Sequence, residues 1–106
     1  MNEPHRRYEM LLPLKLNDGR AVPSELFAQT WAELQDRFGP ISCETQRIRG
    51  LSPEAGPSEQ DDLMRAFVDV PDRSEHREFF VAFKERLKER FEQQDIWITT
   101  HPLEVL

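Results

Sequence analysis

The sequence predicts an α+β protein with the ferredoxin-like arrangement, in which two helices cover one face of a four-stranded antiparallel sheet. Three observations support this prediction. The 106 residues suffice for one hydrophobic core but not for two, so residues 1–106 are expected to form a single domain. Apolar residues recur with a period of two or of 3.6 in successive segments, in the order β-α-β-β-α-β. Right-handed crossovers in this order give the strand sequence fourth, first, third, second.

The first half of the chain contains a strand, a helix and a second strand. Residues 8–16 alternate between apolar and polar side chains, and the letters NDGR then end the strand. Apolar residues at helical spacing predict a helix over residues 23–38, which Gly39 ends. Residues 41–50 predict the second strand. Its alternation loses phase before Ile48, so we expect a bulge there.

A loop and a third strand follow. Residues 50–62 are rich in Gly, Pro and Ser and carry four acids and no base, so we expect a mobile acidic loop. Residues 63–70 alternate again and predict the third strand. At the ends of the chain we expect a flexible start at residues 1–6 and an apolar tail at residues 102–106. An alternative, more open α+β sheet would gain a fifth strand from this tail.

A long helix and a last strand complete the pattern. Asp72 and Glu75 have the spacing of a capping box, which predicts the start of the helix. Its apolar stripe consists of Phe79, Phe80, Phe83, Leu87 and Phe91. The repeated letters KER place acids opposite this stripe and bases on its flanks, which indicates a solvated amphipathic helix and not a basic nucleic-acid patch. The last strand covers residues 96–101, and Pro102 is expected to end it.

Composition and charge exclude several classes of protein. The net charge of −6 argues against broad binding to nucleic-acid backbones. No apolar run approaches the roughly 18 residues that a membrane span needs, and the first residues lack the apolar segment of a signal peptide. The single cysteine, Cys43, excludes an internal disulfide and fits a reducing compartment. We therefore expect a cytoplasmic protein that binds neither nucleic acid nor a membrane.

The face of the sheet that carries no helix is the candidate site. Strand parity places these residues on it: Glu9, Leu11, Pro13, Lys15, Ser42, Glu44, Gln46, Leu63, Arg65, Phe67, Asp69, Trp97, Thr99 and His101. An apolar patch within this set consists of Leu11, Pro13, Leu63, Phe67 and Trp97. Contiguous apolar surface of this kind usually marks a site for a partner or a ligand.

The letters AFVDV on the third strand invite a comparison with RNA-recognition motifs, which stack bases on aromatic side chains of the same open face. Only Phe67 matches. Arg65 occupies the position of a second stacking aromatic residue, and Pro13 occupies the stacking position on the first strand. Since the residues that carry the chemistry are missing, RNA binding is a minor alternative.

Glu9, Asp69 and His101 are candidate catalytic residues. The first strand runs opposite to the third and fourth, so these three side chains are expected at one end of the open face. Two carboxylates and an imidazole bind divalent metals or transfer protons, which favours a metal-dependent hydrolase or nuclease as an alternative function. The competing interpretation is cross-strand polar pairing with Arg7 or Arg65.

Asp18, Cys43 and His76 each have a structural explanation. Asp18 follows the first strand, where small ferredoxin-like ribonucleases of CRISPR systems and related toxins carry an Asp, but an ordinary turn signal also explains it. Cys43 has inward parity and is expected to be a small core residue. His76 is expected to pack on the core side of the second helix. No Gly-rich phosphate loop, zinc-ligand spacing or nucleophile elbow occurs, so no cofactor or metal is expected.

Four segments together carry a resemblance to other proteins: LPLKLNDGR, RAFVDVPD, EFF with FKERLKERF, and IWITTHPLEVL. Over nearly its whole length the chain resembles a group of short, uncharacterised bacterial proteins. The resemblance implies a bacterial origin. It implies no activity, substrate or catalytic residue.

The leading hypothesis is a small non-enzymatic interaction or regulatory module that forms a homodimer through the open sheet face. Many ferredoxin-like domains pair in this way, so the hypothesis is an analogy from the fold. Leu11, Phe67 and Trp97 would form the buried centre of the interface. Leu103, Val105 and Leu106 of the tail would pair with an edge strand of the partner copy. The alternatives are an unidentified protein partner, or a small ligand or peptide, on the same face.

Overall fold

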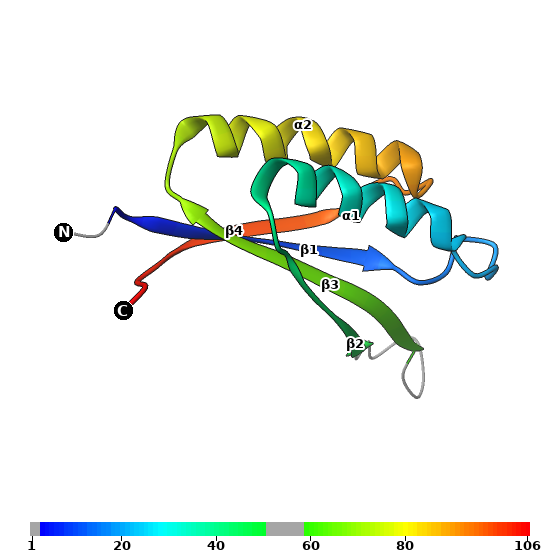
Figure 1. Ribbon diagram of the computed structural model, residues 1–106. Coiled ribbons are helices and arrows are strands. Elements are labelled where there is room, and N and C mark those ends of the chain that lie inside the picture. Colours follow the sequence, from blue (N-terminus) through cyan, green and yellow to red (C-terminus); the bar gives the residue numbers. More distant parts are fainter. Residues whose placement is uncertain (1–2, 51–58) are drawn as a thin grey trace.

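Six elements form the fold in the computed structural model of the chain (Figure 1), which describes residues 3–50 and 59–106 and, within them, omits the side chains of residues 46–50 and 59–62. In chain order they are β1 (His5–Pro13), α1 (Ser24–Phe38), β2 (Ser42–Gly50), β3 (Glu59–Pro71), α2 (Ser74–Arg90) and β4 (Trp97–Leu103). All strand pairs are antiparallel, and the sheet order is β2-β3-β1-β4. This confirms the predicted fold class and strand order. Within the described ranges the sheet has four strands, so the five-stranded alternative is wrong.

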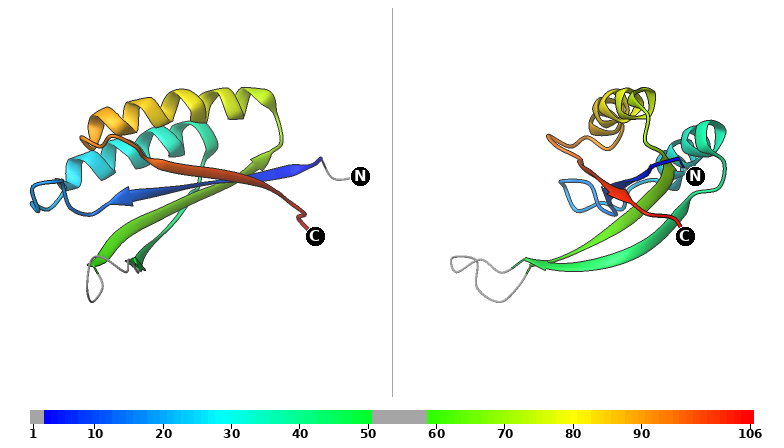
Figure 2. Two further views of the ribbon diagram at one scale, coloured as in Figure 1. Left: turned by 180° about the vertical axis from the view of Figure 1, so that it is seen from behind. Right: turned by 90° about the vertical axis from the view of Figure 1, so that its left-hand side faces the viewer.

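Both helices lie on the same face of the sheet, and the core fills the space between the two layers (Figures 1 and 2). The side chains of β1 that point toward the helices are buried, as are most of those on β3 and most of the apolar stripe of α2. These residues are Tyr8, Met10 and Leu12 on β1, Ala66, Val68 and Val70 on β3, and Phe80, Phe83 and Leu87 on α2. The period of two along the strands and of 3.6 along the helix therefore produced one continuous apolar layer.

Aromatic rings make up much of this core. The ring of Tyr8 stacks on that of Phe80, with centroids 4.2 Å apart and planes at 12°. Phe80 also lies parallel to Phe38 of α1, at 5.4 Å and 3°, so three rings join the sheet to both helices. Aromatic pairs in such geometries add attraction beyond the area that they bury. The aromatic cluster fixes where α2 sits over β1.

The start of α2 differs from the sequence prediction. The helix begins at Ser74, its N-cap residue is Arg73, and no side chain caps it, so the predicted capping box is wrong. The reason lies in the sheet: the backbone N–H of Asp72 donates to the carbonyl of Pro4 at 2.8 Å, which keeps Asp72 extended at the end of β3. The Asp72 carboxylate lies 3.3 Å from Arg6.

The strand ends also correct the sequence analysis. β1 begins at His5 because its partner β3 continues to Pro71, and the two residues are paired. The expected flexible start is therefore wrong for residues 5 and 6, and β1 ends at Pro13, three residues earlier than predicted. Pro102 lies within β4 and does not end it, since a proline that lacks an N–H is tolerated on an edge strand.

The β2–β3 hairpin is longer than predicted. Its register runs without a break from Ser42 opposite Phe67 to Gly50 opposite Glu59, so the expected bulge is wrong. Residues 59–62 belong to β3, which shortens the predicted loop, and residues 51–58 lie outside the described part of the chain. The hairpin extends away from the helices (Figures 1 and 2).

Cys43 is exposed, which corrects its assignment to the core. Its register partner is Ala66, so its parity is inward as predicted. However, β2 is an edge strand, and the β2–β3 hairpin extends away from the helices (Figure 1). Parity alone could not reveal the bend.

None of the helices in the described ranges is long and apolar enough to cross a membrane.

Candidate functional site: the open face of the sheet

Successive rows of side chains cross the open face, one residue from each strand. The register gives three of these rows as His101–Arg7–Asp69, Thr99–Glu9–Phe67–Ser42 and Trp97–Leu11–Arg65–Glu44. Pro13 and Leu63 pair in a fourth row, together with Gln46, whose side chain is not described. The rows place the predicted outward residues of the four strands on one face. Lys15 lies beyond β1, in an isolated bridge with Ala21.

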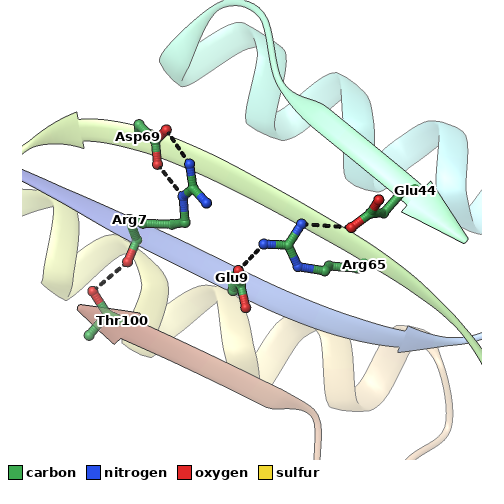
Figure 3. Close-up of polar contacts among 6 residues, drawn as sticks. All are labelled: Arg7, Glu9, Glu44, Arg65, Asp69 and Thr100. Carbon is green, nitrogen blue, oxygen red and sulfur yellow. Dashed lines mark hydrogen bonds and ion pairs between the residues drawn. The ribbon is translucent and has the colours of Figure 1, made fainter. Parts of the chain in front are cut away.

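Arg7 of β1 and Asp69 of β3 form a bidentate ion pair (Figure 3). The Arg7 Nε donates to Asp69 Oδ1 at 2.7 Å and Nη2 donates to Oδ2 at 2.9 Å. These hydrogen bonds, and the positive charge behind them, lower the pKa of the Asp69 carboxyl below its usual value. The Thr100 hydroxyl donates to the Arg7 carbonyl at 2.8 Å, which ties the same residue to β4.

Arg65 joins three strands through two carboxylates (Figure 3). Its Nη1 donates to Glu44 of β2 at 2.9 Å, and its Nη2 donates to Glu9 of β1. Only 15% of the Arg65 side chain is exposed. A guanidinium has N–H donors that point in different directions within its plane, so it suits this bridging role better than an ammonium group would.

The ring of Phe67 lies between these two arginine rows. The Cζ of Arg7 is 4.3 Å from the ring centroid and that of Arg65 is 4.4 Å from it. A guanidinium over an aromatic ring is attracted by its negative face, and more strongly where water is excluded. Phe67 is therefore covered by the chain's own cations, and the positions where a base would stack are occupied. The RNA interpretation loses its one matching residue.

The geometry of the open face favours cross-strand pairing for Glu9, Asp69 and His101. Arg7 stands between Asp69 and His101 in one row, and Glu9 lies in the next row with Arg65. A carboxylate whose pKa is lowered by an arginine is a weak general base at neutral pH. In the described ranges, no three His, Cys, Asp or Glu side chains are grouped closely enough to hold a metal ion.

Asp18 is separate from this group. It follows β1, whereas Asp69 and His101 pair with a residue near the start of that strand. Its Oδ1 accepts the backbone N–H of Arg20 at 3.0 Å, and its Oδ2 lies 2.5 Å from the Arg20 Nε. Both contacts lower the pKa of the Asp18 carboxyl. Asp18 therefore stabilises the turn after β1 through its contacts with Arg20.

His76 packs as a helix residue. Its ring lies edge-on to Phe38 of α1, with centroids 5.3 Å apart. Burial lowers its pKa, because the apolar surroundings disfavour the charged imidazolium.

The apolar residues of the open face gather at the end where β4 begins. Leu11, Pro13 and Leu63 are half-buried, whereas Trp97, opposite Leu11, is 63% exposed. We call these four residues the Trp97 patch. In the tail, Leu103 is half-buried, and Val105 and Leu106 are exposed. The predicted patch is thus divided, since Phe67 is covered and Trp97 is not.

Arg7 and Arg65 are the residues whose importance was underestimated by the sequence analysis. Both have outward parity, in the rows before and after Glu9 and Phe67. One sequence pattern could have indicated these ion pairs: two arginines lie among three acids at outward positions of β1, β2 and β3.

Replacing Asp69 by asparagine is expected to lower stability in a pH-dependent way. The Asp69 pKa is lower in the folded state than in the unfolded chain, so the pair stabilises the fold above the unfolded pKa of about 3.9. This contribution disappears as the pH falls through the folded-state pKa. Because the pair is partly exposed, we expect a difference of about 1 kcal/mol at pH 7 between the wild type and the variant.

Urea unfolding of both proteins at pH 7 and at about pH 2.5 measures this difference. Asp36→Asn is the matched control: Asp36 is exposed on α1, and its side chain has no partner within the described ranges. If the loss of unfolding free energy in Asp69→Asn were the same at both pH values, the ion pair with Arg7 would not be its cause.

Comparisons with known proteins identify the fold only. No protein-family model matches the chain, and no curated protein matches it. A phage SAM lyase in complex with S-methyl-5'-thioadenosine is similar in structure, with a TM-score of 0.68 and 11% identity over 99% of this chain and 93% of that one. A Bacillus cereus protein related to NIF3 is similar with a TM-score of 0.61 and 12% identity, over 97% of this chain and 26% of the other. The same fold thus forms nearly all of an enzyme and about a quarter of a larger protein.

Proposed function

We propose that the chain is a small, non-enzymatic interaction module of the bacterial cytoplasm, which forms a homodimer by packing the open sheet faces of two copies together. The observation that carries this proposal is Trp97. It is the largest apolar side chain on the open face and is 63% exposed beside Leu11. Tryptophan is one of the residue types most enriched among those that dominate binding energy.

The charge of the open face supports a second copy as the occupant. Among its described side chains, the ion pairs of Arg7 and Arg65 include three carboxylates. These five charges sum to −1, whereas the whole chain has a net charge of −6. Two copies repel each other through the acidic parts of their surfaces, but hardly through this face. In an interface with two-fold symmetry the same patch meets itself, so a face with both signs supplies its own complement.

The face is large enough for a stable dimer. Four strands at their usual spacing are about 19 Å wide, and nine residues of β1 are about 30 Å long, which gives roughly 600 Å² in projection. The accessible area of side chains exceeds their projected area. A standard interface buries about 800 Å² on each partner, so most of this face would take part.

The ion pairs also support a role without catalysis. Glu9 and Asp69, the carboxylates with the best positions for acid-base chemistry, are each held by an arginine. They bind strands together and leave little capacity for a proton or a metal ion. The enzyme among the similar structures shares only the fold, and fold does not imply function.

The fluorescence of Trp97 tests the proposal. The chain has two tryptophans, and Trp31→Phe leaves Trp97 as the only one. We expect its emission to shift to the blue, and its quenching by acrylamide to fall, as the protein concentration rises from about 1 µM to about 1 mM. The reason is that the partner copy removes water from the indole ring.

The matched control is Trp97→Phe, which leaves Trp31, half-buried on α1, as the only tryptophan. Its emission should not depend on concentration, since the helix layer lies on the other side of the sheet. Emission of Trp97 that stays solvent-like over the whole range would exclude the sheet-face interface.

A further inference from the structure

A cleft of about 140 Å³ lies on the helix side of the sheet, where α2 runs beside β4 (Figure 2). Its apolar lining includes Tyr8, Phe80, Val81 and Ile98. Val81 is 65% exposed, which is unusual for an apolar residue on a helix that otherwise turns its apolar side to the core. The cleft is open to solvent, and its lining extends to Thr99 on the edge strand β4.

Tyr8 is the unusual residue of this cleft. Only 2% of the residue is exposed, and its ring is held against Phe80. Its hydroxyl is buried and has no hydrogen-bond partner within the described ranges. Buried hydroxyls in native proteins are nearly always hydrogen-bonded, because an unpaired one loses its bonds to water without replacement. A polar group that enters the cleft would supply the missing partner.

Two cations flank the same cleft. The Arg77 side chain has no ion-pair or hydrogen-bond partner in the part of the chain that the structure describes. The Lys84 Nζ lies 3.0 Å from the Asp95 carboxylate. Arg77 therefore gives the cleft an unpaired positive charge, suited to a carboxylate with two oxygens.

The size of the cleft limits what it can hold. A cavity of about 150 Å³ lined by apolar side chains accepts a molecule of the size of benzene. A single ring fits, with one polar group toward the Tyr8 hydroxyl and an anionic group toward Arg77. We propose that the cleft between α2 and β4 binds a small aromatic carboxylate that carries a second polar group, of the hydroxybenzoate class.

Binding of 4-hydroxybenzoate, benzoate and phenol, measured by calorimetry or by NMR titration of the whole chain, tests this site. We expect 4-hydroxybenzoate to bind about tenfold more tightly than benzoate, which lacks the group for Tyr8. We also expect it to bind about tenfold more tightly than phenol, which lacks the group for Arg77.

Two variants assign the contacts. Tyr8→Phe should abolish the advantage of 4-hydroxybenzoate over benzoate, and it should leave the melting temperature equal or higher because it removes an unpaired hydroxyl. Arg77→Gln should abolish the advantage over phenol. Arg86→Gln, on α2 near Phe83 and away from the cleft, is the control and should change nothing.

Two results would overturn the proposal. One is the lack of any binding of 4-hydroxybenzoate up to about 10 mM, which is far weaker than the usual range for specific ligands. The other is binding that Tyr8→Phe and Arg77→Gln leave unchanged, since the ligand would then lie elsewhere. Neither outcome depends on whether the chain forms a dimer.

Discussion

Replacing Phe83 by alanine is expected to lower the free energy of unfolding by about 3–5 kcal/mol. Phe83 is fully buried at the centre of α2, and its ring stacks on Phe79 with centroids 5.1 Å apart. Removing the ring loses its transfer energy and leaves a cavity that neighbouring aromatic rings cannot fill. For a domain of this size the melting temperature should fall by at least about 12 °C.

Urea unfolding of the variant and the wild type at the same protein concentration measures this effect, since dimerisation would make stability depend on concentration. Val81→Ala is the matched control on the same helix, because Val81 is 65% exposed. It should change stability by less than about 0.5 kcal/mol. A loss of less than about 1 kcal/mol for Phe83→Ala would mean that the core is not packed as described.

Replacing Trp97 by aspartate is expected to weaken self-association at least about 100-fold. Two-fold symmetry would place Trp97 of each copy in the interface, so one substitution acts twice. Each aspartate would also bring an unpaired negative charge into a partly dry contact. Sedimentation velocity over a range of concentrations gives the two dissociation constants.

Val81→Asp is the control for this prediction. Val81 has the same exposure as Trp97, within two per cent, but lies on α2 on the other side of the sheet. The variant should associate like the wild type. If Val81→Asp broke the dimer and Trp97→Asp did not, the interface would lie at the helix layer.

Strand parity explains why the architecture was predictable. Buried and exposed side chains must alternate wherever a strand has one covered face, so Tyr8, Met10 and Leu12 identified the inner face of β1 from their spacing alone. The remaining residues of the strand were then predicted to point to the outer face, because successive side chains alternate between the two faces. The strand order could then be predicted from one further rule, that both crossover connections are right-handed.

The bends of the molecule were not predictable in this way. Cys43 has the parity of a core residue, and whether a helix covers it depends on how far the β2–β3 hairpin twists away. Asp72 has the spacing of a helix cap, but its backbone N–H is used by Pro4, nearly seventy residues earlier in the chain. Both errors come from contacts between distant segments, which local pattern does not contain.

The contacts on the open face and in the Tyr8 cleft could not be predicted from local sequence patterns either. The sequence analysis placed Arg65 and three acids on one face and named Arg7 only as a possible pairing partner. The register was needed to show which arginine holds which carboxylate. The alternation along residues 8–16 gives Tyr8 the parity of a core residue. The lack of a partner for its hydroxyl is a property of the packed interior, and no pattern in the sequence reveals it.

The mass of the unmodified chain in solution, determined by sedimentation equilibrium from about 1 µM to about 1 mM, tests the central claim most directly. We expect a mass of twice the 12.5 kDa of one chain at the upper end of this range, with dissociation to the single chain on dilution. A mass of 12.5 kDa at every concentration would contradict it, because the Trp97 patch would then be open in the absence of another partner.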